Sequence, residues 1–334
     1  MNASAAPDLT PFGLAVGHAT DDAGATGLTV IRGIDQPLRA GVAIFGRATG
    51  SRELHAASAD HRVGGRIDAI MLTGGSAYGL DAAAGVMRWM EEHGRGFAVR
   101  GGVVPIVPAA VVFDLAPFGR FDARPTPQMA YDATANARSR DVAEGSVGVG
   151  TGTSVGKILG IANAMKGGFG CASVTSPDGQ MSVAAMAVVN ALGDVRDANG
   201  AVIAGARDAA GGFSDVVSVM RHGAAAAAPT SDALAMRNTT LAVVASSTPL
   251  NAVELTQLAR ASGAALFRRI TPTGSSSDGD IVFAVSPESG SRASVDAMII
   301  ETLAVAALED AIERAVRFAR GRERIPGLAD NDGH

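Results

Sequence analysis

A threonine at the start of an apolar run is the residue in this sequence best suited to do chemistry. Thr239 follows Asn238 and precedes residues 241–245, which read Leu-Ala-Val-Val-Ala. Such an aliphatic and β-branched run, ended by polar residues, is typical of a buried strand, and this puts Thr239 at its N-terminal edge. If the Asn238–Thr239 bond were cut, Thr239 would carry a hydroxyl nucleophile and a free α-amine with a pKa of about 8, which could serve as the base.

The same residues also have a simpler explanation. Two threonines suit the start of a strand sterically, and asparagine commonly ends a loop. On local sequence alone we favour this structural explanation, so the chemistry depends on which other polar groups accompany Thr239.

Four further polar residues lie in apolar or glycine-rich sequence: Lys157, Asn190, Asp278 and Asp280. Each has a structural alternative. A lysine is most often exposed, and Asn190 could simply cap the end of an apolar, strand-like run. Asp278 and Asp280 point to the same face if a strand includes both, and are solvated or turn-forming acids if it does not.

Other catalytic classes fit this sequence poorly. Residues 150–157 lack the glycine and the final hydroxyl residue of a phosphate-binding loop, and no dinucleotide or Gly-x-Ser-x-Gly pattern is complete. The histidines are scattered without metal-ligand spacing, so we expect neither a metal nor a cofactor. Cys171, the single cysteine, lies in a glycine-rich apolar stretch that favours a small buried thiol over a nucleophile.

Bulk properties indicate a globular protein. A chain of 334 residues with 47% hydrophobic content can fill one large domain or two small ones. A net charge of -5 argues against nucleic-acid binding. With no signal sequence, no membrane-spanning run and one cysteine, we expect a cytoplasmic protein without a membrane or disulfide framework.

Helical and strand-like segments alternate along the chain, with several strands adjacent. The helical periodicities cover residues 249–266 and 294–320, and a further helix is expected to begin at Ser76 as its N-cap and to end near Gly94. Residues 203–237 indicate an exposed, poorly specified segment. We therefore predict an α+β or layered arrangement at least as readily as a doubly wound sheet, and a single domain.

Five segments in a fixed order point to a family. They are residues 13–21, 72–81, 150–157, 238–240 and 278–280, and together they span nearly the whole chain. This ordered set resembles the self-processing β-aminopeptidase and L-aminopeptidase/D-esterase family, and most closely its branch of nylon-oligomer (6-aminohexanoate oligomer) hydrolases. The resemblance implies a four-layer αββα sandwich of the N-terminal-nucleophile-like type, shared with ornithine acetyltransferases.

The resemblance also implies a role for each polar residue. The single catalytic domain 1–334 would cut itself between Asn238 and Thr239 into fragments 1–238 and 239–334, and Thr239 would then attack amides through an acyl-enzyme. Lys157 would depress the pKa of the Thr239 amine, and Asn190 would donate to the oxyanion. Asp278 and Asp280 would orient Thr239 and stabilise charge on the base.

Substrates implied by the resemblance are small peptides or oligomers of β- or ω-amino acids. Phe113 would border the substrate cleft, where some relatives carry tyrosine, and Ser76 and Tyr78 would lie beside it, although capping and packing also explain them. A homotetramer built as a dimer of dimers is expected. Two alternatives stay open: an acyltransferase of the ornithine acetyltransferase type, and a structural relative that does not process itself.

Overall fold

Two β-sheets packed face to face form the centre of the protein. The computed structural model describes residues 6–115, 118, 120–222, 238–290 and 296–330. One sheet has, in spatial order, β12 (Gly168–Thr175), β13 (Ser182–Asn190), β16 (Thr239–Ser246), β18 (Ile281–Pro287), β3 (Leu38–Ile44) and β5 (Arg66–Ile67). The other has β1 (Leu14–Asp21), β2 (Thr26–Gly33), β6 (Ala69–Thr73), β9 (Ala109–Val111) and β4 (Ser51–Arg52).

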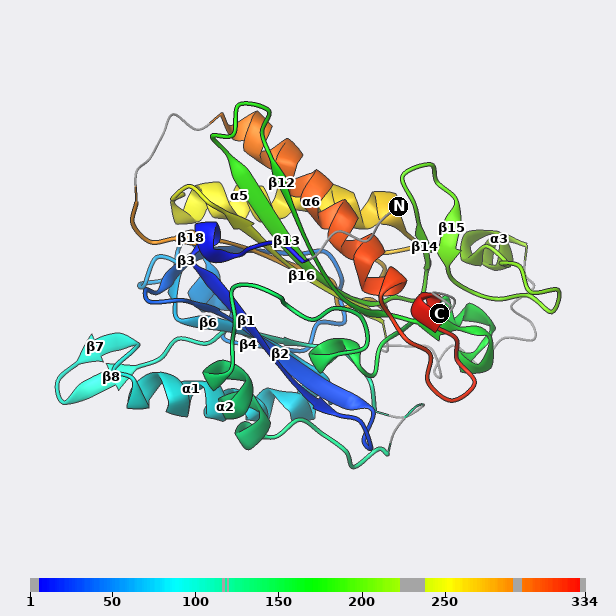
Figure 1. The fold of residues 1–334 in the computed structure, drawn as a ribbon, viewed down its shortest axis with the longest axis horizontal. Coiled ribbons are helices and arrows are strands. Elements are labelled where there is room, and N and C mark those ends of the chain that lie inside the picture. The colour runs from blue at the N-terminus through cyan, green and yellow to red at the C-terminus, as the bar shows by residue number, and fades with distance from the viewer. Residues whose placement is uncertain (1–5, 116–117, 119, 223–237, 291–295, 331–334) are drawn as a thin grey trace.

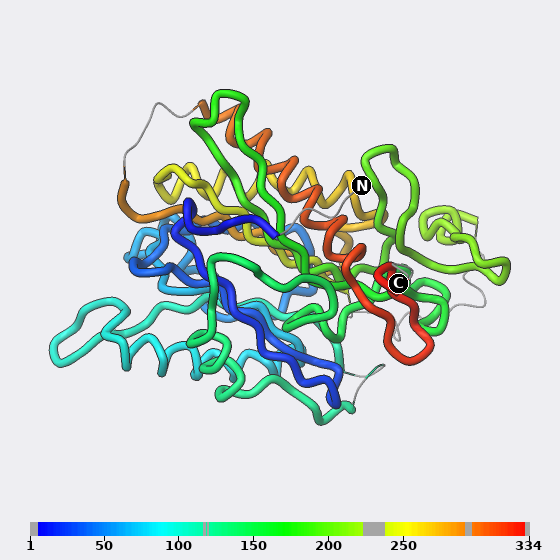
Figure 2. The backbone as a smooth tube through the Cα atoms, viewed as in Figure 1, coloured from blue at the N-terminus to red at the C-terminus, as the bar shows by residue number. Residues whose placement is uncertain are grey.

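Helices cover the outer face of each sheet, as Figure 1 shows. The sheet that contains β16 is covered by α5 (Ala252–Arg269) and α6 (Ala297–Arg317), and the other by α1 (Ala83–Glu92) and α2 (Pro127–Ala135). Strand β3, which lies early in the chain, pairs with β18, which lies near the end of the chain; the path of the backbone can be followed in Figure 2. The predicted four-layer αββα sandwich is confirmed, and both predicted long helices are present with ends shifted by three residues.

Strand β16 is buried on both faces because it lies between the second sheet and the helices. Leu241 and Val243 belong to the core between the two sheets, whereas Ala242 and Val244 belong to the core under α5 and α6. Successive side chains of a strand alternate between faces, so Thr239 shares the inter-sheet face with Leu241. This double burial explains why the strand reads as one continuous apolar run rather than an alternating one.

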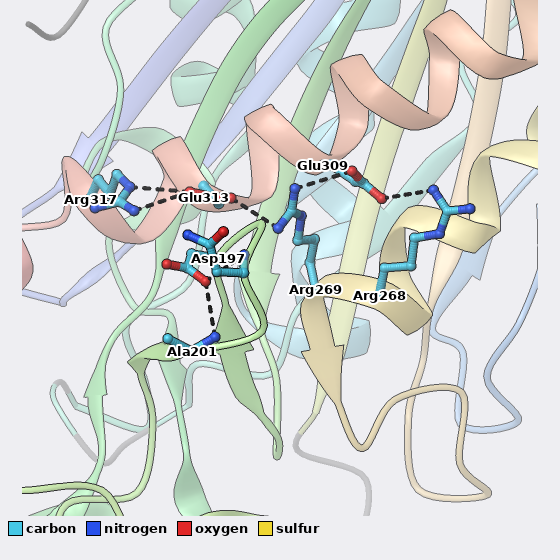
Figure 3. Close-up of polar contacts among 8 residues, drawn as sticks. Asp197, Ala201, Arg268, Arg269, Glu309, Glu313 and Arg317 are labelled. Carbon is cyan, nitrogen blue, oxygen red and sulfur yellow. Dashed lines mark hydrogen bonds and ion pairs between the residues drawn. The ribbon is translucent and has the colours of Figure 1, made fainter. Parts of the chain in front are cut away.

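A capping box stabilises the start of α5, and ion pairs join α5 to α6. Asn251 and Glu254 form a reciprocal capping box at the start of α5. Arg269, at the end of α5, pairs with Glu309 and Glu313 of α6 at 3.1 and 3.2 Å (Figure 3). Arg269 is 7% exposed, so these two carboxylates compensate a largely buried cation.

The described residues also form smaller sheets and short helices. The minor strands are β7 (Phe97–Val99), β8 (Gly102–Val104), β10 (Ser154–Val155), β11 (Met165–Lys166), β14 (Asp194–Arg196), β15 (Val202–Ala204) and β17 (Ile270–Thr271). The short helix α3 covers Val216–Arg221, and 3₁₀ turns cover Thr10–Phe12, Leu54–Ala57, Ser76–Ala82, Gly148–Gly150, Lys157–Leu159, Ile161–Asn163 and Leu328–Asp330.

Two local predictions were wrong. Ser76 does not cap a helix: it begins a 3₁₀ turn after Gly75, whose left-handed backbone makes the turn without a side-chain cap. Within the segment predicted as poorly specified, residues 203–222 are ordered, because Asp194 accepts hydrogen bonds from the backbone of Ala206 and Val216. Residues 223–237 lie outside the described residues.

Neither α5 nor α6, nor any other helix in the described ranges, combines the length and the apolar character that crossing a bilayer requires.

Candidate active site

Thr239 and Asn190 occupy directly opposed positions on neighbouring strands. In the antiparallel pairing of β13 with β16, the two residues are partners at the end of the ladder. Both are buried, with exposed fractions of 5% and 1%. Because opposed residues of an antiparallel pair point to the same face, both side chains lie at the margin of the inter-sheet space.

Within the described residues, two donors bind the carbonyl oxygen of the peptide bond between Asn238 and Thr239. The Thr239 hydroxyl donates to the Asn238 oxygen at 2.6 Å, and the backbone N–H of Gly279 donates to the same oxygen at 2.9 Å. A parallel bridge between Asn238 and Asp278 keeps the two segments in register. The hydroxyl therefore lies beside the carbonyl group whose bond the sequence predicts to be cut.

Gly279 lies beside the Asn238–Thr239 bond, although no role was predicted for it from the sequence. A Cβ atom placed on this glycine would lie 2.8 Å from the Thr239 hydroxyl oxygen and 2.9 Å from the Ala48 carbonyl oxygen. A side chain here would thus displace the hydroxyl or the strand end. The signal in the sequence was the glycine itself, between two acids just before a strand.

Asp278 and Asp280 are buried in a turn, so of the two structural alternatives the turn-forming acids are right and the solvated acids are wrong. Their exposed fractions are 4% and 1%. The strand begins at Ile281, after both residues, so their positions follow from the loop rather than from strand alternation. Asp278 accepts a hydrogen bond from the Ser275 backbone at 2.7 Å.

Asp280 ties the nucleophile strand to the neighbouring loop. Its Oδ1 accepts from the Thr240 backbone N–H at 2.6 Å, and its Oδ2 accepts from the Thr273 hydroxyl at 2.8 Å and the Gly274 N–H at 3.0 Å. Burial, with a smaller contribution from the nearby Asp278 carboxylate, raises the pKa of Asp280 to about 6. The three donors match an ionised carboxylate.

Lys157 is buried against Asn190 and is not a surface lysine. It is 8% exposed, and its Nζ donates to the backbone oxygen of Asn190 at 3.0 Å and to its Oδ1 at 3.1 Å. The Ser154 N–H donates to the same Oδ1 at 3.1 Å, and the Asn190 Nδ2 donates to the Phe113 oxygen at 3.2 Å. These bonds fix the orientation of the Asn190 amide, with Oδ1 toward Ser154 and Lys157 and Nδ2 toward Phe113. They also place Lys157 beside Asn190, the residue opposite Thr239 in the ladder.

The three predicted substrate-binding residues follow strands β6 and β9 of the other sheet. Phe113 follows β9 and contributes its carbonyl oxygen to Asn190. Ser76 lies after β6, and its N–H donates to Val112, the residue before Phe113. Tyr78 is 53% exposed and is covered on one side by the Arg124 guanidinium, 3.5 Å from the ring centroid. Substrate contact by these residues stays a prediction.

Two buried ionisable residues near Asn190 were also missed. Asp114 follows Phe113, and Lys166 pairs with Ser154 in the β10–β11 ladder. Burial raises the pKa of Asp114 to about 6, and burial together with the Arg322 charge lowers the pKa of Lys166 to about 7. Each is a lone charge in an apolar or glycine-rich run, the same signal that singled out Lys157.

The potential metal ligands of the described residues are dispersed, and the single cysteine is buried in the core. Across the described ranges, no three His, Cys, Asp or Glu side chains are grouped so that they could hold a metal ion. Cys171 is buried in the inter-sheet core, and burial raises the pKa of its thiol, as expected for a packing residue.

The sequence is similar to those of known peptidases and amide hydrolases. The sequence profile of peptidase family S58 matches residues 11–323. An uncharacterized aminopeptidase of Mycobacterium tuberculosis is 43% identical over 262 residues, covering 75% of this chain and 73% of that protein. A 6-aminohexanoate-oligomer endohydrolase of Paenarthrobacter ureafaciens is 28% identical over 326 residues, covering 91% and 84%.

A solved structure shares the fold. The L-aminopeptidase D-Ala-esterase/amidase of Ochrobactrum anthropi, described as a variant of the N-terminal-nucleophile hydrolase fold, superposes with a TM-score of 0.69 at 21% identity. The match covers 98% of this chain and 93% of that one. The family profile spans most of the sequence, and the resemblance seen in the sequence motifs is confirmed. The chain belongs to peptidase family S58 and is an amide-bond hydrolase with the N-terminal-nucleophile fold.

Proposed function

We propose that the chain cuts itself between Asn238 and Thr239 and that Thr239 is then the nucleophile of an amide hydrolase. The observation that carries this proposal is the junction geometry: the Thr239 hydroxyl lies 2.6 Å from the Asn238 carbonyl oxygen, which the Gly279 N–H also binds. An N–H donor on that oxygen polarises the carbonyl and stabilises the negative charge that forms during attack.

Self-cleavage is a transfer of the Asn238 acyl group from nitrogen to oxygen. The Thr239 oxygen bonds to the Asn238 carbonyl carbon, the C–N bond breaks, and the hydroxyl proton goes to the departing nitrogen. Water then hydrolyses the resulting ester. This leaves a carboxyl group on Asn238, and a free hydroxyl and a free amine on Thr239, in fragments 1–238 and 239–334 of one domain.

In each later turnover the new Thr239 amine accepts the proton of its own hydroxyl as that hydroxyl attacks a substrate amide. Asn190 donates to the oxyanion, a role supported by its position opposite Thr239 and by the bonds that orient its amide. Lys157 places a cation at Asn190, where it lowers the pKa of the amine. Asp280 holds the strand end through the Thr240 N–H.

The substrates we propose are small peptides and oligomers of β- or ω-amino acids. The names of two relatives, an aminopeptidase and a 6-aminohexanoate-oligomer endohydrolase, support this class. The test is incubation of the purified, cleaved protein with 6-aminohexanoate oligomers and with β- and α-peptides. Release of amino acids or shorter oligomers without any added amine acceptor is expected; products that form only when an amine is added would indicate acyl transfer instead. The predicted tetramer and cytoplasmic location stay predictions.

Replacing Gly279 by alanine is expected to slow self-cleavage on the order of 10²-fold, because the added Cβ would meet the Thr239 hydroxyl oxygen at 2.8 Å and misplace it. The rate is read from the loss of the 33.5 kDa band on denaturing gels after synthesis. Gly102→Ala is the matched control, since a Cβ there meets nothing within 4 Å. Unchanged cutting in Gly279→Ala would contradict the proposed junction geometry.

Self-cleavage should also slow as the pH falls through about 6, the raised pKa of Asp280. Protonated Asp280 can no longer accept all three of its hydrogen bonds, so the strand end loosens. The fold should persist, because a carboxyl whose pKa is raised on folding contributes stability below its ordinary pKa and loses it only as the pH rises through the raised value.

The measurement is the self-cleavage rate against pH in freshly made precursor, in which Thr239 has no free amine, with folding followed by circular dichroism. Asp114 also has a raised pKa of about 6, so the pH profile is measured again in Asp114→Asn. The fall in self-cleavage rate on the acid side of the profile, its acid limb, should persist in that variant. An acid limb near pH 4 would show that Asp280 does not control the step.

A further inference from the structure

Lysine is rare in this chain and is confined to one place. The sequence contains two lysines, Lys157 and Lys166, while its other basic side chains are mostly arginines. Both lysines are buried, and both lie beside Asn190: Lys157 binds it directly, and Lys166 is the strand partner of Ser154, whose N–H binds Asn190. Lys166 is 1% exposed and has no part in the mechanism described so far.

Lys166 holds the loop that precedes Ser154, the residue whose N–H binds Asn190. Its Nζ donates to the carbonyl oxygens of Thr151 and Thr153 at 2.6 and 2.8 Å, and it lies 4.7 Å from the centre of the Phe118 ring. Thr153 immediately precedes Ser154, the residue whose N–H binds the Asn190 Oδ1. An ammonium group with three donors suits two converging carbonyls in a way that the planar guanidinium of arginine does not.

Asp114 lies next to Phe113, the residue that binds the other end of the same amide. Its Oδ2 accepts from the Thr26 hydroxyl at 2.7 Å and its Oδ1 from the Gly75 N–H at 2.6 Å. A Cβ on Gly74 or Gly152 would lie 2.1 or 2.7 Å from the Asp114 Oδ2, so two glycine-containing loops close around this carboxylate. Asp114 immediately follows Phe113, whose carbonyl oxygen binds the Asn190 Nδ2.

Each end of the Asn190 amide is thus bound by a backbone group whose neighbour is anchored by a buried charge. Lys166 anchors the segment that binds Oδ1, and Asp114 anchors the segment that binds Nδ2. The two charges have opposite sign and interact through space, and each is hydrogen-bonded to two polar groups. Burying two ionisable groups is costly unless they are compensated, so a packing role alone is a poor reason for either.

We propose that Asp114 and Lys166 are positioning residues that hold the Asn190 side chain in the orientation required for amide hydrolysis. The inference rests on the proposed role of Asn190 as oxyanion donor. Neither residue touches substrate in this arrangement; both act through the backbone of residues 113 and 153–154. A displacement of a catalytic group by about 1 Å can cost on the order of 10²-fold in rate, so loss of either anchor should appear in kcat rather than in KM.

The test is a double-mutant cycle on cleaved enzyme, with kcat expressed per cleaved chain. Lys166→Met, Asp114→Asn and the milder Thr26→Val are each made in the natural chain and in Asn190→Ala, and assayed on one small amide substrate. Asp68→Asn is the matched control. Asp68 is also a buried carboxyl that accepts a backbone N–H, from Ile106 at 2.8 Å. It differs in its place, because it precedes β6, whereas Gly74 and Gly75 follow the other end of that strand.

We expect Lys166→Met and Asp114→Asn each to lower kcat by about 10-fold or more with KM within about twofold, and to have less than about a twofold effect once Asn190 is alanine. Asp68→Asn should not change kcat in either background. Equal losses of kcat with and without Asn190 would overturn the proposal, as would a loss confined to KM. If Lys166→Met fails to fold, Asp114→Asn and Thr26→Val decide the cycle.

Failure of this inference can be told apart from failure of the proposed function. If Asn190→Ala keeps full kcat while Thr239→Ala is inactive, the nucleophile stands and the positioning role falls. If Thr239→Ala is itself active, the proposed function falls, whatever the cycle shows.

Discussion

Replacing Thr239 by alanine should leave an uncut chain of 33.5 kDa that does not hydrolyse amides. The change removes the hydroxyl that lies 2.6 Å from the Asn238 oxygen, and with it both the group that cuts the chain and the group that attacks substrate. Removing a catalytic nucleophile lowers kcat by factors on the order of 10⁶ in a well-studied hydrolase, so activity should fall to the background rate. Denaturing gels and a substrate assay measure the two losses on one preparation.

The adjacent Thr240 provides the matched control. It is fully buried and β-branched like Thr239, but its side chain points to the opposite face of β16, toward the helices. Thr240→Val should therefore cut itself and hydrolyse amides at close to the natural rate, and Thr239→Ser should keep part of both activities. Hydrolysis by uncut Thr239→Ala would remove Thr239 from the mechanism.

Removing the side-chain amide of Asn190 should have the next largest effect. Loss of one oxyanion donor lowers kcat on the order of 10²- to 10³-fold in comparable acyl-transfer enzymes, so Asn190→Ala is expected to fall in that range with little change in KM. Asn190 lies opposite Thr239 in the β13–β16 ladder, where no other described residue shares that register position. The measurement is kcat per cleaved chain on a small amide.

Asn190→Asp separates catalysis from packing. It keeps the oxygen that accepts from Ser154 and Lys157 but loses the N–H donor. We expect it to be as slow as Asn190→Ala yet closer to the natural chain in thermal stability. A fast Asn190→Asp variant would mean that the amide N–H does not bind the oxyanion.

Much of the fold follows from the sequence because apolar periodicity is strong where the layers meet. The run after Thr239 is apolar at every position because β16 has a sheet on one face and helices on the other. The two long helices were placed by their apolar faces to within three residues. The turn at Ser76 was mispredicted because a serine before an apolar run suggests an N-cap, whereas here Gly75 makes the turn through its left-handed backbone.

The candidate site was only partly predictable because its members come together through long-range pairing. Thr239, Asn190 and Lys157 were each singled out, but only the β13–β16 register places the first two opposite each other. Gly279 was missed because its contribution is a backbone N–H and a missing side chain, neither of which composition reveals. Asp114 follows β9, whereas Lys166 belongs to β11, and local sequence does not show that the segments beside them bind one amide.

The most direct test of the account is the intact mass of active protein after its amines have been tagged by reductive methylation. Residues 239–334 contain no lysine, so a fragment that begins at Thr239 has one amine to tag, the α-amine that self-cleavage creates. We expect fragments 1–238 and 239–334, with a single tagged amine on the second fragment and that tag on Thr239. An active protein with an uninterrupted chain, or with a cut at another bond, would contradict it.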